Sequence, residues 1–246
     1  MTLYQTPGQY LNFIGFLFES AIIGVGVILL ILILIRFMEK KHRLTLLLFL
    51  IFLNYLIAII FSWVSKIFVA FDLLGSITPE SLEGIFIFRI KDFRISEFFV
   101  AIALFISYIL KVNVFEDEYD PILKIIVAIY GGFTAFYVLV IYVEGNVLLD
   151  AIAFLLVFIF MSIIYIPFMI RSIKTYNSVE DRSIKRAFLS LALMSLSFML
   201  IFLNFFIDRI FILTGSLGFT LFYFLAWIFA IIGMTCAYLG YIRRPK

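Results

Sequence analysis

The sequence predicts an all-α integral membrane protein, a bundle of seven transmembrane helices forming a single domain over residues 1–246. Hydrophobic residues make up 65% of the chain and charged residues only 14%, whereas soluble domains contain about 45–50% and about 25%. The few charges fall in short stretches between long apolar runs, the pattern of polar loops on either side of a hydrocarbon layer. A water-soluble fold could not bury this much apolar surface.

Seven apolar runs are long enough to cross a bilayer, since a transmembrane helix needs about 20 residues. A β-barrel is excluded because barrel strands alternate apolar and polar residues over about ten positions, whereas these runs are continuously apolar. The predicted helices cover residues 12–37, 44–70, 97–115, 121–143, 147–170, 184–207 and 215–242.

The basic residues predict the orientation of the bundle. With the N-terminus outside and the C-terminus in the cytoplasm, 14 of the 19 lysines and arginines lie on the cytoplasmic side, as the positive-inside rule requires. The acidic turn 115–120 also falls on that side, but acidic residues contribute little to topology. We therefore expect a multi-pass protein of the cell membrane. The five basic residues assigned to the outer side are Lys66, Arg89, Lys91, Arg94 and Arg209.

Local signals mark three helix positions. Asp120 followed by Pro121 is typical of an N-cap with proline at the first helical position, so the fourth helix should begin there. Ser178 and Asp181 have the spacing of a capping box, which predicts the start of the sixth helix. Pro167 removes one backbone hydrogen bond and should bend the cytoplasmic end of the fifth helix.

The long connection between the second and third helices, about residues 71–96, shows partial alternation at residues 85–90. Alternation of this kind favours a short β-hairpin with its turn at Lys91 and Asp92. An amphipathic segment lying in the membrane interface is the alternative.

The last apolar run carries small residues at spacings of four, three, four and three, which places them along one helix face. Such a stripe lets two helices approach closely in a membrane, so we interpret it as a helix-packing seam, with a lined pore as the alternative. Its members are Ala226, Ala230, Gly233, Ala237 and Gly240.

A polar stripe in the sixth run begins at Ser183, includes Asn204 and ends at Asp208 beside Arg209. Hydrogen bonds to neighbouring helices would explain it, but a polar track that leads to a charge also fits a ligand site open to the exterior. We expect Asn204, Asp208 and at least one of Glu19 and Lys66 to face the bundle interior near its outer end, because a carboxylate in hydrocarbon costs several kcal/mol.

Glu19 and Lys66 are predicted at similar depth near the outer surface. They could pair across neighbouring helices, or each could extend to the lipid headgroups. Asn54, in the middle of the second run, is interpreted as an interhelical hydrogen-bonding position.

The sequence contains no recognisable catalytic or metal-binding motif. Cys236 and His42 are the single cysteine and histidine, so neither an intramolecular disulfide nor a His-pair metal site can form. Ser216 in the segment 215–218 has no base placed to activate it, and an enzyme is not expected. The basic residues form no aromatic-interleaved patch for nucleic acid.

The predicted topology is similar to that of the microbial rhodopsins, but this resemblance stops at the arrangement of helices. The run 215–242 contains no lysine that could form a Schiff base with retinal. No family and no cofactor are therefore assigned.

Three functional hypotheses remain open. The first is a receptor-like or sensory protein that binds a small or lipophilic ligand in its outer half and signals through cytoplasmic partners. A transporter or channel subunit for a small solute or ion is the second, and a structural or assembly subunit bound to another copy or another membrane protein is the third. A vestibule open to the outer side would favour the receptor. A cavity that reaches past Ser190 would favour the transporter. A small-residue stripe that faces lipid would favour the assembly subunit.

Overall fold

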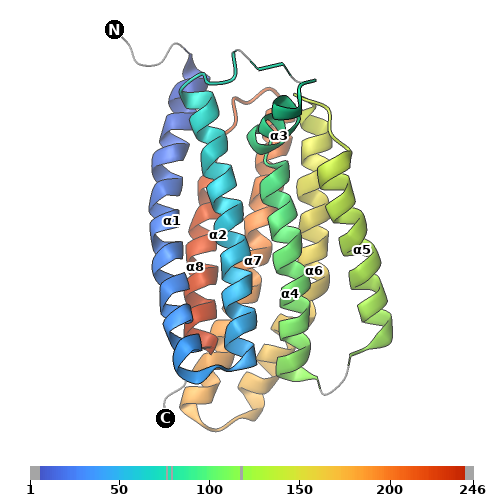
Figure 1. Cartoon of the computed structure of the whole chain (residues 1–246). Coiled ribbons are helices and arrows are strands. Elements are labelled where there is room, and N and C mark those ends of the chain that lie inside the picture. The colour runs from blue at the N-terminus through green and yellow to red at the C-terminus, as the bar shows by residue number, and fades with distance from the viewer. Residues whose placement is uncertain (1–5, 76, 79, 117–118, 242–246) are drawn as a thin grey trace.

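The computed structural model describes residues 6–75, 77–78, 80–116 and 119–241 (Figure 1). Within these ranges the chain forms eight helices and no strand, and seven of the helices are long and apolar enough to span a membrane. The seven-helix prediction is confirmed to that extent. The helices are α1 (Pro7–Lys40), α2 (Arg43–Ala70), α3 (Leu82–Lys91), α4 (Arg94–Phe115), α5 (Pro121–Val140), α6 (Val147–Ser178), α7 (Arg182–Leu213) and α8 (Leu221–Tyr241).

Six of the long helices pack in a closed ring, in the order α1, α2, α4, α6, α7 and α8, with α8 returning to α1. The seventh, α5, packs on the outside of this ring against α4 and α6 (Figure 1). We call the end where α1 begins and α3 lies the N-terminal end of the bundle, and the opposite end, where α8 finishes, the C-terminal end (Figure 1).

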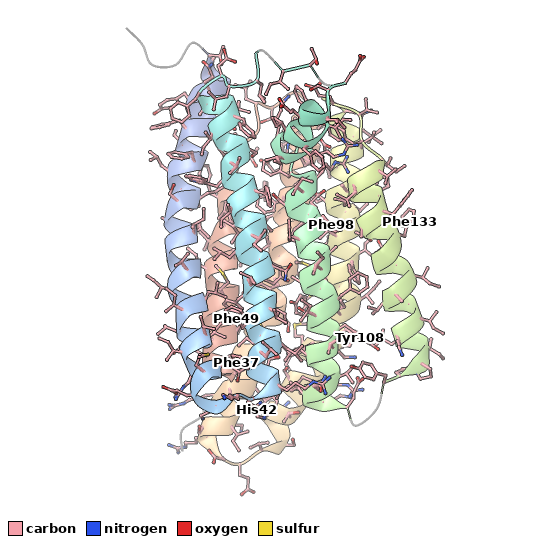
Figure 2. The ribbon with its side chains drawn as sticks, viewed as in Figure 1. Phe37, His42, Phe49, Phe98, Tyr108 and Phe133 are labelled. Atoms are coloured by element: carbon pink, nitrogen blue, oxygen red, sulfur yellow. The ribbon has the colours of Figure 1, made fainter. Side chains whose placement is uncertain are left out.

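The outer surface of the bundle is apolar, as lipid contact requires. On α5 the exposed side chains include Ile122, Ile129 and Phe133, which is 52% exposed. Figure 2 shows Phe133 on the outer side of α5, among apolar side chains that cover the bundle along its length. Hydrocarbon cannot form hydrogen bonds with backbone N–H and C=O groups. A helix pairs these groups within itself and can therefore cross the membrane.

Polar caps define where several helices begin. The Asp120 side chain accepts hydrogen bonds from the backbone N–H groups of Ile122 and Leu123, with Pro121 at the first helical position, so the predicted start of this helix is confirmed. The predicted capping box at Ser178 is wrong. Ser178 is the last residue of α6, and Asp181 itself caps α7 by accepting from Ser183.

The predicted β-hairpin is also wrong, because α3 occupies that segment. Ser81 caps its N-terminus by accepting from the Gly84 N–H, Glu83 lies in the first turn, and Arg89 and Lys91 lie in the last, which complements the helix dipole. Lys91 and Asp92, the expected turn, form the end of the helix. Phe93 then adopts left-handed backbone angles and leads directly into α4.

Candidate functional site

Buried ionisable side chains gather at the N-terminal end of the bundle. Such groups are expensive to keep at membrane depth, and a cluster of them is a candidate functional site. Five of the helices supply them, each within the part of the helix that lies near this end. The buried members are Glu19 on α1, Lys66 on α2, Arg94 and Glu97 on α4, Asp150 on α6 and Asp208 on α7, with Arg209 partly buried beside them.

Glu19 and Lys66 form a buried ion pair between α1 and α2. The Lys66 Nζ lies 3.6 Å from the Glu19 Oε1, and the side chains are 1% and 0% exposed. Ser62 and Tyr223 both donate hydroxyl hydrogen bonds to the same Glu19 oxygen. The Lys66 ammonium also lies 3.8 Å from the centre of the Phe93 ring. The two side chains therefore pair across neighbouring helices and do not extend to the lipid headgroups.

Arg94 and Asp150 form a second buried pair, between α4 and α6. The Arg94 Nε and Nη2 both donate to the Asp150 Oδ1, at 3.1 and 2.9 Å. Glu97 lies one turn further along α4 and is 2% exposed. Neither of its carboxylate oxygens has a hydrogen-bonding partner among the described residues, which sets it apart from the paired carboxylates.

Asp208 fixes the start of α8. Its Oδ1 accepts hydrogen bonds from the Thr220 backbone N–H at 2.9 Å and from the Thr220 hydroxyl at 2.7 Å. The neighbouring Arg209 guanidinium lies over the rings of Phe93 and Phe154, 4.9 and 5.3 Å from their centres.

Two amides bond within their own helices. Asn204 is buried as expected, but its amide donates to the Leu200 carbonyl, and Asn54 likewise donates to the Leu50 carbonyl. Neither makes an interhelical bond through its amide N–H, so the interhelical interpretation of Asn54 is not what the structure shows.

An internal cavity of about 70 Å³ lies inside the helix ring, among α2, α4, α6, α7 and α8. Its walls are mainly apolar and aromatic, and its polar members are few. Glu97, Ser96 and Arg209 line it, and each has at least one buried polar atom without a hydrogen-bonding partner among the described residues, as does the Trp227 indole N–H. The aromatic walls include Phe93, Phe154, Phe202, Phe205, Tyr223 and Trp227.

A second hollow, the vestibule, lies between this cavity and the N-terminal end. It has a volume of about 200 Å³ and is lined by charged residues. Phe93, Arg209 and Tyr223 line both spaces and so form the partition between them. Of the sequence candidates, three line the vestibule directly, while Glu19 lies behind Lys66 and Asn204 lines neither space. The charged residues around the vestibule are Lys66, Lys91, Asp92, Asp208 and Arg209.

The connection between α5 and α6 forms part of the rim above these spaces. The Tyr142 hydroxyl donates to the Asp92 carboxylate at 2.7 Å, and Lys91 pairs with Glu144 at 3.3 Å. Burial and the hydrogen bond to Asp92 raise the pKa of Tyr142, which therefore keeps its proton and remains the donor. The rim is thus tied to the end of α3 by one hydrogen bond and one ion pair.

Toward the C-terminal end the cavity is closed by a hydroxyl cluster. The Tyr165 hydroxyl lies 3.1 Å from that of Tyr55 and 3.0 Å from that of Ser107, and all three side chains are buried. Phe198 packs on both tyrosine rings, with centroid distances of 5.0 and 5.5 Å. Next to this cluster Ser107, Tyr165 and Phe198 line a hollow of only about 10 Å³, about the space of one water molecule.

The small-residue stripe of α8 faces the inside of the bundle. All five of its members are buried. A Cβ on Gly233 would lie 2.6 Å from the Phe198 ring, and one on Gly240 would lie 2.5 Å from a methyl of Leu191, so both glycines allow α7 to approach α8 closely. The structure places this seam between α7 and α8.

A separate ion cluster joins α4 and α6 at the C-terminal end. Glu116 pairs with the buried Lys111 at 2.9 Å and with Arg171 at 3.1 Å. Arg171 also donates to the Phe115 carbonyl. These bonds involve Glu116, the first carboxylate of the acidic turn between α4 and α5.

Sequence reasoning missed Arg94, Glu97 and Asp150. The predicted third helix began at residue 97, which left Arg94 in the loop and Glu97 at its edge, and Asp150 was taken as part of an apolar run. One signal was available: Arg94 and Glu97 are three residues apart, a spacing that places both on one helix face. Extending the helix by one turn would have put two charges at membrane depth.

Comparisons with protein-family models, with curated proteins and with solved structures found no match to this chain. Among the described residues, no group of three histidine, cysteine, aspartate or glutamate side chains could hold a metal ion.

Proposed function

We propose that this chain is a receptor-like or sensory membrane protein that binds a small or lipophilic ligand at the N-terminal end of its helix bundle. In this proposal the N-terminal end faces outward from the cell membrane, the C-terminal end faces the cytoplasm, and the signal passes to protein partners at the cytoplasmic loops. The orientation rests on the 14 to five distribution of basic residues.

The observation that carries the proposal is the pair of spaces at the N-terminal end. A charged vestibule leads to an apolar cavity in which Glu97 and the Trp227 indole have unmet hydrogen-bonding capacity. Ligand sites commonly combine apolar walls with a few convergent polar groups. A ligand that enters through the vestibule would pass the partition formed by Phe93, Arg209 and Tyr223.

The closed inner side of the cavity favours a receptor over a transporter. The hydroxyl cluster of Tyr55, Ser107 and Tyr165 separates the cavity from the C-terminal end. Ser190 lines a different hollow at that end, which shares no lining residue with the cavity or the vestibule. The burial of the α8 stripe against α7 likewise gives no support to an assembly subunit that would use the stripe as its interface.

Co-purification tests the ligand site. Ala230 lines the cavity and is 5% exposed, so Ala230→Phe should fill it. Ala128 lies on the exposed face of α5, and Ala128→Phe adds the same atoms outside the bundle. We expect small molecules detected by mass spectrometry with the wild-type protein to persist in Ala128→Phe and to be lost in Ala230→Phe. Equal recovery from both variants would contradict a ligand site in the cavity.

Reconstituted vesicles distinguish signalling from transport. A fluorophore attached at Glu180, between α6 and α7, should report a conformational change when the co-purified ligand is added back, without movement of ligand into the vesicle. Ligand uptake that is lost in Ala230→Phe would instead establish the transporter.

A further inference from the structure

Glu97 is the carboxylate of this end that the described residues leave without a hydrogen bond to either oxygen. It is 2% exposed and lines the cavity, and neither oxygen has a hydrogen-bonding partner among the described residues. A buried ionised carboxylate is strongly unfavourable unless it is paired and hydrogen-bonded. A positive or hydrogen-bond-donating group inside the cavity would satisfy both free oxygens and stabilise the ionised carboxylate.

Among the described residues, the buried cations of this end pair with other carboxylates or lie over aromatic rings, although Arg94 Nη1 and Arg209 Nε have no hydrogen-bonding partner. Lys66 pairs with Glu19, and Arg94 donates twice to Asp150. Arg209 lies over two phenylalanine rings. The cluster of ionisable side chains at the N-terminal end contains four carboxylates and three cations, so the carboxylates exceed the cations by one. The carboxylates are Glu19, Glu97, Asp150 and Asp208, and the cations are Lys66, Arg94 and Arg209.

The cavity walls suit a cation that carries an apolar group. Phe205 contacts Trp227 edge to face at 5.4 Å and Phe154 at 5.7 Å, so the aromatic side chains form a connected wall around the space near Glu97. Aromatic ring faces attract cations, most strongly where water is excluded, and the rings also accept an alkyl group. The two known cation–ring contacts of Arg209 show that these side chains already hold a positive charge in this way.

The size of the cavity limits the part of the ligand that it can hold. A cavity needs about 10–15 Å³ to accommodate one water molecule, so a volume of about 70 Å³ has room for about five non-hydrogen atoms. A primary ammonium group with a four-carbon chain meets that limit. A longer molecule would extend past Phe93 and Tyr223 into the vestibule.

From this arrangement we infer that the ligand is a small organic cation, a protonated amine with an apolar body, and that Glu97 is its counter-ion. The inference rests on the proposed ligand-binding function and names the chemical class of the ligand. The ammonium group donates hydrogen bonds to the two free oxygens of Glu97, and the alkyl or aryl body packs against the aromatic walls.

The chain offers a built-in reporter for the test. Trp63 and Trp227 are its two tryptophans, and Trp227 lines the cavity. In a Trp63→Phe background the intrinsic fluorescence comes from Trp227 alone. The purified full-length variant would be titrated at constant ionic strength with n-butylammonium, n-butanol and butyrate, which have similar size and differ in charge. We expect n-butylammonium to bind at least 10-fold more tightly than either of the others.

Two further variants separate the role of Glu97 from general electrostatics. Glu97→Gln keeps the shape of the side chain and should weaken n-butylammonium binding at least 10-fold. Glu83→Gln removes one negative charge at the same end of the bundle, at an exposed side chain that lines neither the cavity nor the vestibule, and should change binding less than twofold. Thermal unfolding of each variant verifies that it is folded.

The outcomes distinguish this inference from the proposed function. If n-butanol or butyrate binds as tightly as n-butylammonium, or if Glu97→Gln binds n-butylammonium unchanged, the cation inference is wrong. In that case, binding that disappears in Ala230→Phe still identifies the cavity as a ligand site. If none of the three compounds alters Trp227 fluorescence, both the inference and the proposed site are contradicted.

Discussion

Glu19 and Glu97 are both buried carboxylates at the same end of the bundle, but their surroundings differ. One oxygen of Glu19 receives two hydroxyl hydrogen bonds and lies 3.6 Å from the Lys66 ammonium, whereas the oxygens of Glu97 have no hydrogen-bonding partner among the described residues. A paired carboxylate is the pattern of a structural group, and an unpaired one beside a cavity is the pattern of a binding group. The two residues should therefore respond differently to substitution.

Glu19→Gln is expected to destabilise the protein, because it leaves Lys66 buried without a counter-ion. Removing one partner of a buried ion pair costs about 3–5 kcal/mol. Adding Lys66→Met removes the second charge and should recover much of that loss. Thermal unfolding of the two single variants and of the double variant measures the coupling. Additive effects in the double variant would show that the pair makes no specific contribution.

Asp208 should also prove structural, through its bonds to Thr220 at the start of α8. Asp208→Ala removes two hydrogen bonds and should lower the stability by about 2–3 kcal/mol. Asp208→Asn keeps an oxygen that can accept from the Thr220 N–H and should cost less. Thermal unfolding measures both. If Asp208→Asn changes ligand binding more than it changes stability, the carboxylate itself takes part in binding.

At the scale of helices, the sequence correctly predicted the transmembrane spans, which depend on long apolar runs. It predicted the wrong secondary structure for the short segment between α2 and α4. Seven spans and the Asp120 cap follow from length and local chemistry, and the structure has both. Residues 85–90 alternate partly, but a serine cap, an acidic first turn and a basic last turn make α3 a helix. A period of two over six residues is too short to outweigh those signals.

The candidate site was only partly predictable for a related reason. A pattern along one helix identifies residues that share a face, such as Asn204 and Asp208, but it does not say which helix lies opposite. The sequence identified Lys66 and Glu19 as site candidates because both lie within long apolar runs that clearly form transmembrane helices. Glu97 and Asp150 lie in the first turn of their helices, where the edge of an apolar run is ambiguous.

The seam between α7 and α8 leads to a prediction about glycine. In Gly233→Ala the new Cβ would lie 2.6 Å from the Phe198 ring, so the two helices must separate or the ring must move. Overpacking of this kind costs about 1–3 kcal/mol. Gly132 on α5 has no atom within 4 Å of the corresponding position, and alanine there should be neutral or stabilising. Thermal unfolding compares the two variants, and equal stability would show that the seam is loosely packed.

At the scale of the whole molecule, the ring of six helices separates two different ends. The N-terminal end contains the cavity, the vestibule and the charges around them, while the C-terminal end has the ion cluster around Glu116 and a separate hollow lined by Ser190. Because α5 lies outside the ring, its large exposed apolar surface is free to contact lipid without affecting the cavity. The proposed function therefore depends on which end faces outward.

Cysteine labelling in intact cells tests that orientation. In a Cys236→Ala background, single cysteines would replace His42, between α1 and α2, and Glu83, at the start of α3; both positions are exposed and lie at opposite ends of the bundle. Because most lysines and arginines lie at the end that contains His42, the positive-inside rule places that end in the cytoplasm. We expect a membrane-impermeant maleimide to label Glu83→Cys in intact cells, and to label His42→Cys only after permeabilisation. Labelling of both variants in detergent verifies that each thiol is reactive. The reverse pattern in intact cells would turn the vestibule toward the cytoplasm, and the ligand would then have to come from inside the cell.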